Sequence, residues 1–486
     1  MKIGFDNQKY LAMQSEHIKE RIGQFGDKLY LEFGGKLFDD YHASRVLPGF
    51  EPDSKLQMLM QLKDQAEIVI VISAKDIQQN KVRQDLGITY QEDVLRLIKE
   101  FRKVGLFVGS VVITQYTGQD LADSFKQKLK RRKINCYYHY YIDGYPTNTQ
   151  KIISKDGFGK NDYIKTERPL VVVTAPGPGS GKMATCLSQL YHDHVHGIKA
   201  GYAKYETFPI WNLPLTHSVN LAYEAATADL NDVNMIDPFH LEAYNKVTVN
   251  YNRDIEIFPV LRNIFEAIYG ESPYKSPTDM GVNMAGFCIS DDEACQDASK
   301  QEIIRRYFNS KTRFVREQCK EEEVHKQEMV MKQAGVTEED RKCVVAARQK
   351  EKESHSFSGA LELADGTIVT GKTTHLMGAC SSALMNAIKH LAGIEDEALL
   401  IEPEAFGPIQ KLKTKYLGSV NPRLHTNEIL IALSLSAQSN PLAQKAMEQL
   451  KQLKGTQAHI TCDVAHVDAS VYSNLGIQIT FEAEKH

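Results

Sequence analysis

The sequence Val171-Val172-Val173-Thr174-Ala175-Pro176-Gly177-Pro178-Gly179-Ser180-Gly181-Lys182 determines the fold that we expect for this chain. Its first residues are apolar and β-branched, which predicts a buried strand, and its glycines and prolines predict a tight turn. Apolar residues then recur at helical spacing up to Gly197, which marks the end of the helix. Such a strand, turn and helix can point backbone N–H groups at one place, where they would stabilise a bound phosphate.

The turn matches the phosphate-binding pattern G-x-x-x-x-G-K-[ST] only in part. Gly181 and Lys182 fit the pattern, but Pro176 stands where its first glycine belongs. Met183 replaces the hydroxyl residue that would contact Mg²⁺. The alternative interpretation is a structural strand-to-helix turn whose lysine is solvated.

Strands alternate with helices on both sides of this turn, which predicts an α/β fold with a doubly wound, mostly parallel sheet of Rossmann-like or P-loop-like type. Besides the strand before the turn, strands are predicted at residues 29–33, 68–72, 107–114 and 136–142. Ligands bind beyond the carboxyl ends of the strands in such sheets. We therefore expect the polar residues that follow the strands to meet at one edge: Gly34, Gly35, Lys36, Ser73, Lys75, Thr114 and Asp143.

A P-loop enzyme that uses Mg²⁺ also needs an acidic residue at the end of a neighbouring strand. Asp143 is our first prediction for this role, because it follows the strand at 136–142. Asp237 is the second. Each could instead be a turn or helix-capping aspartate.

Two other polar groups have two interpretations each. Tyr205, Glu206, Thr207 and Asn212 could contact a substrate or could be structural turn residues. His192 and His196 share a helix face and could bind a metal, but no third ligand is evident. We favour a polar helix end in which the imidazoles suit the C-terminal dipole.

The length of 486 residues predicts more than one domain. We expect the doubly wound α/β domain over residues 1–270 and a linker with a charged helical region over 271–355. A smaller C-terminal α/β domain is expected over 356–486, where Asp365-Gly366 between apolar runs predicts a β-hairpin. Apolar residues in the charged helical region could pack either on the rest of the chain or on a second copy, so a homo-oligomer is a further possibility.

The composition is that of a globular chain, with 42% hydrophobic and 25% charged residues. A formal net charge of −4 gives no electrostatic reason to expect a nucleic-acid or membrane partner. The sequence has neither a secretory signal core nor an apolar run of about 18 residues, so we expect a cytoplasmic location. Its eight cysteines form no C-x-x-C pair, which favours reduced thiols and no structural zinc.

Three stretches carry a resemblance to a known family: residues 31–36 (LEFGGK), residues 173–185 (VTAPGPGSGKMAT) and residues 371–377 (GKTTHLM). Through them the chain resembles, over nearly its whole length, a family of uncharacterised bacterial cytoplasmic proteins with a domain of unknown function. Some members carry the label "ATP-dependent zinc protease". The resemblance implies that Pro176 and Met183 are features of the family's own turn. The sequence contains no H-E-x-x-H motif, so we do not expect a zinc protease of that type.

We predict an enzyme that binds a nucleotide or another phosphorylated small molecule and catalyses phosphoryl transfer, nucleotidyl transfer or a ligase-type reaction. The expected cofactor is ATP or another phosphorylated nucleotide with Mg²⁺. Two alternatives stay open: a non-catalytic, oligomeric metabolite-binding or regulatory protein, and a metal hydrolase built on His192 and His196. The predicted catalytic residues are Lys182 and Asp143, and the predicted cofactor-binding residues are Gly177, Gly179, Ser180, Gly181, Lys182, Thr185, Gly34, Gly35 and Lys36.

Overall fold

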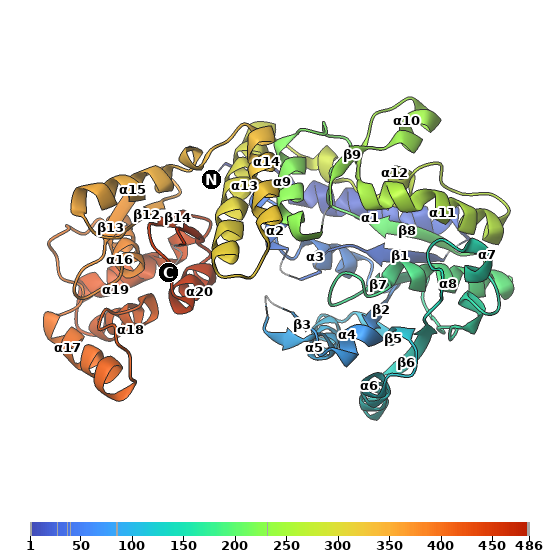
Figure 1. The fold of residues 1–486 in the computed structure, drawn as a ribbon, viewed down its shortest axis with the longest axis horizontal. Coiled ribbons are helices and arrows are strands. Elements are labelled where there is room, and N and C mark those ends of the chain that lie inside the picture. The colour runs from blue at the N-terminus through green and yellow to red at the C-terminus, as the bar shows by residue number, and fades with distance from the viewer. Residues whose placement is uncertain are drawn as a thin grey trace. The chain divides into compact units, whose positions relative to one another are not determined.

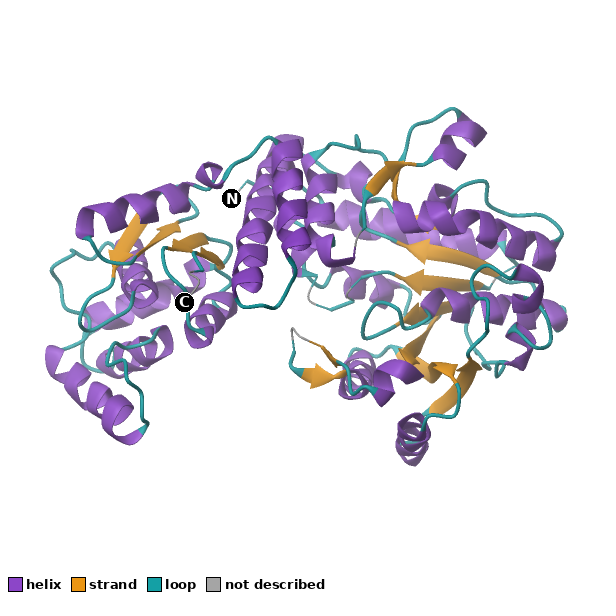
Figure 2. Ribbon diagram, viewed as in Figure 1, coloured by secondary structure: helices purple, strands orange, loops and turns teal. Residues whose placement is uncertain are grey.

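A computed structural model describes residues 2–26, 28–35, 37–38, 40–83, 86–230 and 232–483. The chain forms two compact units, and each combines helices with a sheet (Figures 1 and 2). The larger unit comprises Ile3–Tyr223 and Asp232–Cys295. The smaller unit comprises Met1–Lys2, Glu224–Asn231 and Gln296–His486. Within the described ranges, no helix is long and apolar enough to cross a membrane.

The larger unit is built on a seven-stranded sheet in the order β11-β8-β1-β7-β2-β5-β6. Every pair of neighbouring strands in it is parallel, which confirms the predicted fold class. The strands are β1 (Leu29–Phe33), β2 (Ala66–Ser73), β5 (Phe107–Tyr116), β6 (Asn135–Tyr140), β7 (Leu170–Thr174), β8 (Gly201–Tyr205) and β11 (Gly281–Val282). The strand that opens the glycine-rich turn, β7, lies between β1 and β2.

The central strands are buried on both faces, and their side chains alternate between two hydrophobic cores. Leu31, Val172 and Ile70 belong to one core, whereas Tyr30 and Val71 belong to the other. The first face is covered by α1 (Asn7–Gln24), α3 (Ser54–Gln61), α4 (Ala74–Gln78), α5 (Tyr90–Lys103) and α6 (Asp120–Arg131). The second face is covered by α7 (Thr149–Ile152), α8 (Lys182–Val195), α11 (Asn252–Tyr269) and α12 (Pro277–Met280).

The remaining elements of this unit are short connections. They are α2 (Tyr41–Val46), α9 (Ser218–Ala226), α10 (Pro238–Tyr244), and two antiparallel strand pairs: β3 (Val82–Arg83) with β4 (Ile88–Thr89), and β9 (Asn234–Ile236) with β10 (Val249–Tyr251). Helix α5 begins with a capping box formed by Thr89 and Glu92, which satisfies backbone N–H groups at its start. Helices α9 and α13 each contribute residues to both units.

The smaller unit contains a mixed four-stranded sheet in the order β13-β12-β14-β15. Its strands are β12 (Ser358–Glu362), β13 (Ile368–Lys372), β14 (Gln457–Ile460) and β15 (Gln478–Phe481). Strands β12 and β13 form the hairpin predicted from Asp365-Gly366. Its helices are α13 (Asp292–Val315), α14 (Glu321–Ala334), α15 (Lys342–Ser354), α16 (Ala379–Leu391), α17 (Pro403–Lys411), α18 (Thr426–Ser436), α19 (Pro441–Met447) and α20 (His466–Asn474).

The core of the larger sheet is expected to control the stability of its unit. Ile70 is fully buried in β2, so Ile70→Ala removes buried methyl groups and leaves a cavity. We expect it to lower the free energy of unfolding by about 2–5 kcal/mol, measured by urea denaturation. Val82 is half exposed, and the control Val82→Ala should change this free energy by less than about 0.5 kcal/mol. Equal effects of the two substitutions would contradict the assignment of β2 to the core.

Candidate functional site

The turn between β7 and α8 has the backbone geometry that only glycine adopts easily. Gly179 has φ +74° and Gly181 has φ +89°, in the left-handed region. Gly177 is required for another reason, because a Cβ there would lie 2.2 Å from the hydroxyl oxygen of Tyr90. The three glycines therefore shape the turn by conformation and by close approach, as a phosphate-binding turn requires.

The N–H groups of this turn are available to a ligand. Within the part of the chain that the structure describes, the backbone N–H groups of Gly177, Gly179, Ser180 and Gly181 donate to no protein acceptor. Pro178 and Gly179 are exposed, so solvent reaches the turn. Lys182 begins α8, whose first N–H groups add to the positive end of the helix.

The two hydroxyl groups that could replace the one missing at Met183 are both engaged with the backbone. Ser180 Oγ donates to the carbonyl of Gly177 at 2.9 Å, and Thr185 Oγ1 donates to the carbonyl of Gly181 at 2.9 Å. Their protons hold the turn and the first turn of α8 together. Only the oxygen lone pairs of Ser180 and Thr185 remain for a cation or ligand.

Residues near the carboxyl end of β5, which is separated from β7 by β2, contact this turn. Thr114 Oγ1 in β5 donates to the carbonyl of Ser180 at 2.6 Å. Gln115 reaches the carbonyl of Gly179 at 3.5 Å. Tyr90, at the start of α5, packs against Gly177. The turn is thus supported from the β5 side of the sheet.

The loop after β1 carries a buried ion pair that the sequence did not indicate. Lys55 of α3 is buried, and its Nζ lies 2.7 Å from Asp40 Oδ2 and 3.5 Å from the carbonyl oxygen of Gly34. Gly35 has φ +70° and lies against the same ammonium group. The predicted binding residue Lys36 lies outside the described residues.

Glu32 places a carboxylate on the strand next to the turn. It lies on β1, opposite Val173 of β7 and opposite Lys204 of β8. It is buried, and its Oε2 accepts a hydrogen bond of 2.7 Å from the hydroxyl of Tyr202. Burial raises the pKa of the Cys186 thiol on α8, Glu32 raises it further, and Lys182 opposes the shift. Glu32 and Lys182 therefore act on the same buried thiol.

Lys204 is the centre of a second group of buried charges on this side of the sheet. Its ammonium group contacts the carboxylate of Asp254, in the first turn of α11, and the hydroxyl of Tyr251. Glu206 Oε1, just beyond β8, lies 3.0 Å from the same ammonium group. Only about a tenth of the side-chain surface of each of Lys204, Glu206 and Asp254 is exposed.

The pKa values of Glu206 and Lys204 are both raised, but for different reasons. Burial raises the pKa of Glu206 to about 7; Lys204 opposes the shift, and Asp254 adds to it. Burial lowers the pKa of Lys204, but Asp254, Tyr251 and Glu206 outweigh it and hold that pKa well above its usual range. Near neutral pH the site therefore combines a permanent ammonium group with a carboxyl group that exchanges its proton.

The two aspartates predicted as Mg²⁺ ligands have other contacts. Asp143 is 83% exposed and lies 3.2 Å from Lys151, on the loop after β6. Strands β2 and β5 separate β6 from β7. The loop after β6 nevertheless brings Tyr145 near Glu32: burial is the main cause that raises the pKa of Tyr145, and the charge of Glu32 raises it further. Asp237 caps α10 by accepting hydrogen bonds from the N–H groups of two residues, Phe239 and His240.

His192 and His196 lie on one face of α8 but do not point at a shared ligand site. His196 Nδ1 lies 2.6 Å from the carbonyl oxygen of His192, and its ring stacks on Tyr163. Burial lowers the pKa of His192. Over the described ranges, no three side chains of His, Cys, Asp or Glu are grouped so that they could hold a metal ion.

Two family models together match nearly the whole chain. "Domain of unknown function DUF1846, N-terminal" matches residues 3–335, and "Domain of unknown function DUF1846, C-terminal" matches residues 339–486. The chain belongs to the DUF1846 family. This confirms the resemblance drawn from the three sequence stretches.

Bacterial relatives are similar over the full length. The "UPF0371 protein" of Streptococcus thermophilus (strain ATCC BAA-491 / LMD-9) is 60% identical over 481 residues, which cover 99% of this chain and 97% of the relative. The "UPF0371 protein" of Streptococcus pneumoniae serotype 19F (strain G54) is 59% identical with the same coverage. These names carry no activity, so the chemistry must be argued from the site.

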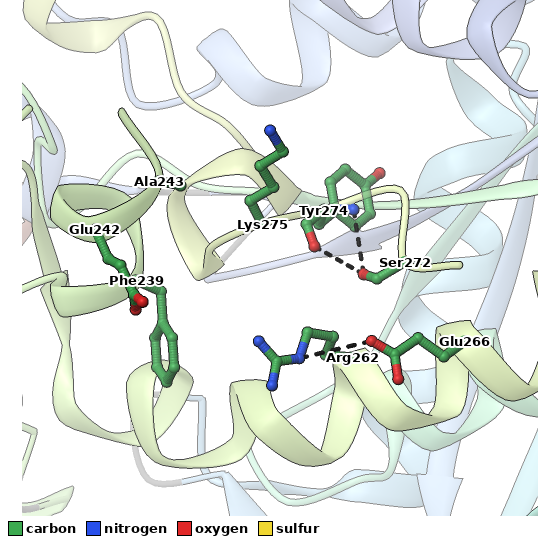
Figure 3. Close-up of a pocket in the computed structure, with 8 residues that line it drawn as sticks. All are labelled: Phe239, Glu242, Ala243, Arg262, Glu266, Ser272, Tyr274 and Lys275. Atoms are coloured by element: carbon green, nitrogen blue, oxygen red, sulfur yellow. Dashed lines mark hydrogen bonds and ion pairs between the residues drawn. The ribbon is translucent and has the colours of Figure 1, made fainter. Parts of the chain in front are cut away.

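A cavity of about 440 Å³ lies elsewhere in the larger unit, between α10 and α11. Arg262 and Glu266 of α11 line it 3.7 Å apart, and Figure 3 shows Lys275 on the opposite side. The lining contains two cations, Arg262 and Lys275, and two carboxylates, Glu242 and Glu266, so it favours neither sign of charge. Neither the glycine-rich turn nor the Lys204 group lines this cavity.

Sequence reasoning missed most of the charged residues around the turn. Glu32 had one signal, as the only charged residue in a five-residue apolar strand. Glu206 was singled out only as a loop residue with two interpretations. Lys55 and Asp254 gave no local signal, because each lies in a helix whose polar residues are ordinarily solvated.

The raised pKa of Glu206 predicts how pH changes stability. In the folded chain the carboxyl group of Glu206 keeps its proton up to about pH 7, whereas the ordinary pKa of such a group is 4.5. The folded chain therefore binds the extra proton between these values, and its stability falls as pH rises through them. Glu206→Gln has no such proton, so its free energy of unfolding relative to wild type should rise by up to about 3 kcal/mol between pH 4.5 and 7.5.

Urea denaturation at both pH values measures this difference. The matched control is Glu266→Gln, which removes an exposed carboxylate of α11. The stability of the control relative to wild type should stay constant with pH. A pH-independent difference for Glu206→Gln would show that Glu206 has an ordinary pKa.

Proposed function

We propose that this chain is an enzyme that binds a nucleotide or another phosphorylated small molecule at the turn between β7 and α8, and transfers a phosphoryl or nucleotidyl group. The observation that carries the proposal is the set of four unengaged N–H groups from Gly177 to Gly181, next to Lys182 and the positive end of α8. Backbone N–H groups and a lysine at a helix N-terminus are what phosphate oxygens require.

Each part of the turn has a role in this proposal. The N–H groups of Gly177, Gly179, Ser180 and Gly181 hold the phosphate oxygens without moving, because the turn is supported by Thr114 and by its own Ser180 hydroxyl. Lys182 neutralises the charge that develops on these oxygens during transfer. Lys55, fixed by Asp40, is a further cation beside the loop after β1.

Glu32 suits the role of Mg²⁺ partner better than Asp143. Its strand is the direct neighbour of β7, and its buried carboxylate accepts a hydrogen bond from the hydroxyl of Tyr202. Mg²⁺ is held in phosphate sites by one or two carboxylates together with the phosphates. With Mg²⁺ bound, Glu32 would hold it from β1, and the ion would neutralise phosphate charge.

A thermal unfolding screen tests the proposal. We expect ATP with Mg²⁺, or inorganic pyrophosphate, to raise the melting temperature by several degrees at saturating concentration, because a ligand that binds only the folded chain stabilises it. Lys182→Ala should abolish this rise by removing the ammonium group next to the phosphate. Lys130→Ala, which removes an exposed lysine of α6, should leave it unchanged.

The outcomes separate the proposal from its alternatives. No rise with any nucleotide, pyrophosphate or phosphorylated metabolite would contradict a phosphate site at the turn. A rise that Lys182→Ala leaves intact would place the ligand elsewhere. A rise without any turnover would favour a metabolite-binding regulatory protein over an enzyme.

A further inference from the structure

A second cavity of the larger unit, of about 320 Å³, lies beside the carboxyl-terminal half of α5. The residues that line it come from α5 and from the connection between α6 and β6: Leu95, Ile98, Lys99, Arg102, Arg132 and Ile134. Half of this lining is cationic and half is apolar, and no carboxylate belongs to it among the described residues. It therefore differs from the cavity between α10 and α11, where cations and carboxylates are equal in number.

The three cations of this cavity are available to a ligand. Lys99, Arg102 and Arg132 are exposed, and within the described ranges their side chains form no hydrogen bond or ion pair with the protein. The carboxyl ends of α5 and α6 stabilise Arg102 and Arg132 through the helix dipole, but Lys99 lies before the last turn of α5. An anion placed among the three side chains would reduce the repulsion between their like charges.

The surface around the cavity is also basic, although the chain has a formal net charge of −4. Residues 128–133 (KLKRRK) contain five cations, and α5 adds Lys103 in its last turn. Glu100 of α5 lies 4.0 Å from Lys103, a residue that does not line the cavity. A concentration of one sign of charge attracts ligands of the opposite sign, so this part of the surface favours anions.

The buried part of the lining is apolar. Ile98 and Ile134 are buried members of the hydrophobic core on the first face of the sheet, and Leu95 packs against that core. An apolar group placed on these side chains would be removed from water, which favours binding in proportion to the area covered. Apolar walls with a few polar groups are typical of small-molecule sites, and the volume of the cavity lies at the lower end of their range.

This cavity is separate from the glycine-rich turn. Helix α5 begins at Tyr90, which packs against Gly177 of the turn, and the helix then continues to Lys99. With a rise of about 1.5 Å per residue, these two positions of α5 are roughly 14 Å apart along its axis. The connection at residues 132–134 precedes β6, at the amino end of the parallel sheet, whereas the turn follows the carboxyl end of β7. The two places therefore bind different ligands.

We propose that this cavity is a binding site for a small organic anion, a carboxylate or phosphate group attached to an apolar body. The anionic group lies among Lys99, Arg102 and Arg132, and the apolar body covers Ile98 and Ile134. Each guanidinium group can donate two parallel hydrogen bonds to a carboxylate or a phosphate. The inference does not rest on the proposed function, because no residue of the turn lines this cavity.

Isothermal titration calorimetry with matched probes tests the site. The probes 1-naphthoate and 1-naphthyl phosphate carry the two anionic groups on the same apolar body. Acetate and inorganic phosphate are the anionic groups alone, and 1-naphthol is the apolar body alone. We expect one or both naphthyl anions to bind wild type about tenfold more tightly than any control probe, because only they use both parts of the lining. The tighter of the two identifies the anionic group that the site prefers.

Four variants locate the bound naphthyl anion. Lys99→Ala and Arg132→Ala remove exposed cations of the lining, and each should weaken binding by about fivefold or more, because a charged hydrogen bond is lost. The matched control is Lys130→Ala, which removes an exposed cation of the same basic run that does not line the cavity. It should change the affinity by less than about twofold at an ionic strength of about 0.15 M, since salt screens distant charges. Lys182→Ala should also leave the affinity unchanged.

Four results would each overturn the inference. A naphthyl anion that binds no more tightly than acetate or phosphate would show that the apolar residues are not used. Equal binding of 1-naphthol would show that the cations are not used. Equal weakening by Lys130→Ala and Arg132→Ala would indicate diffuse attraction to a basic surface. Loss of binding with Lys182→Ala, but not with Arg132→Ala, would place the ligand at the glycine-rich turn and would leave the proposed function standing.

Discussion

Strand β7 forms backbone hydrogen bonds with β1 on one side and with β2 on the other, and the candidate site depends on this placement. A central strand of a parallel sheet that is covered by helices on both sides has to be apolar on both faces, because neither face meets water. Residues 170–174 meet this requirement and are fully buried. The turn that follows is thereby fixed between the loop after β1 and the supporting residue Thr114 of β5.

The same constraint explains why charges gather at this edge of the sheet. Backbone groups inside the sheet are paired with neighbouring strands, so free N–H groups and charged side chains occur where the strands end. Two buried lysines, Lys55 and Lys204, are each held by a carboxylate there, because an isolated buried ammonium group would be unstable. The cluster at Lys204 contains a second carboxyl group, Glu206, although Asp254 alone would balance the single positive charge of Lys204.

Much of the fold could be predicted because its signals are local. The apolar runs at residues 68–72 and 170–174 and the turn signal Asp365-Gly366 became buried strands and a hairpin. Helix α1 lacks a clear apolar face in the sequence, since its buried side includes polar residues such as Gln14, whose amide donates a hydrogen bond to the carbonyl of Val282. That contact joins residues 268 positions apart, and no short pattern contains it.

The sequence by itself determined five of the seven strands of the larger sheet, the glycine-rich turn, Lys182 at the start of its helix, and the parallel class of the sheet. These follow from β-branched runs, glycine conformations and helical spacing within about twenty residues. Only the tertiary structure decided that β7 lies between β1 and β2, and that Glu32, Lys204, Glu206 and Asp254 come together. Strand order depends on which buried surfaces fit, and a cluster drawn from β1, β8 and α11 exists only after the chain has folded.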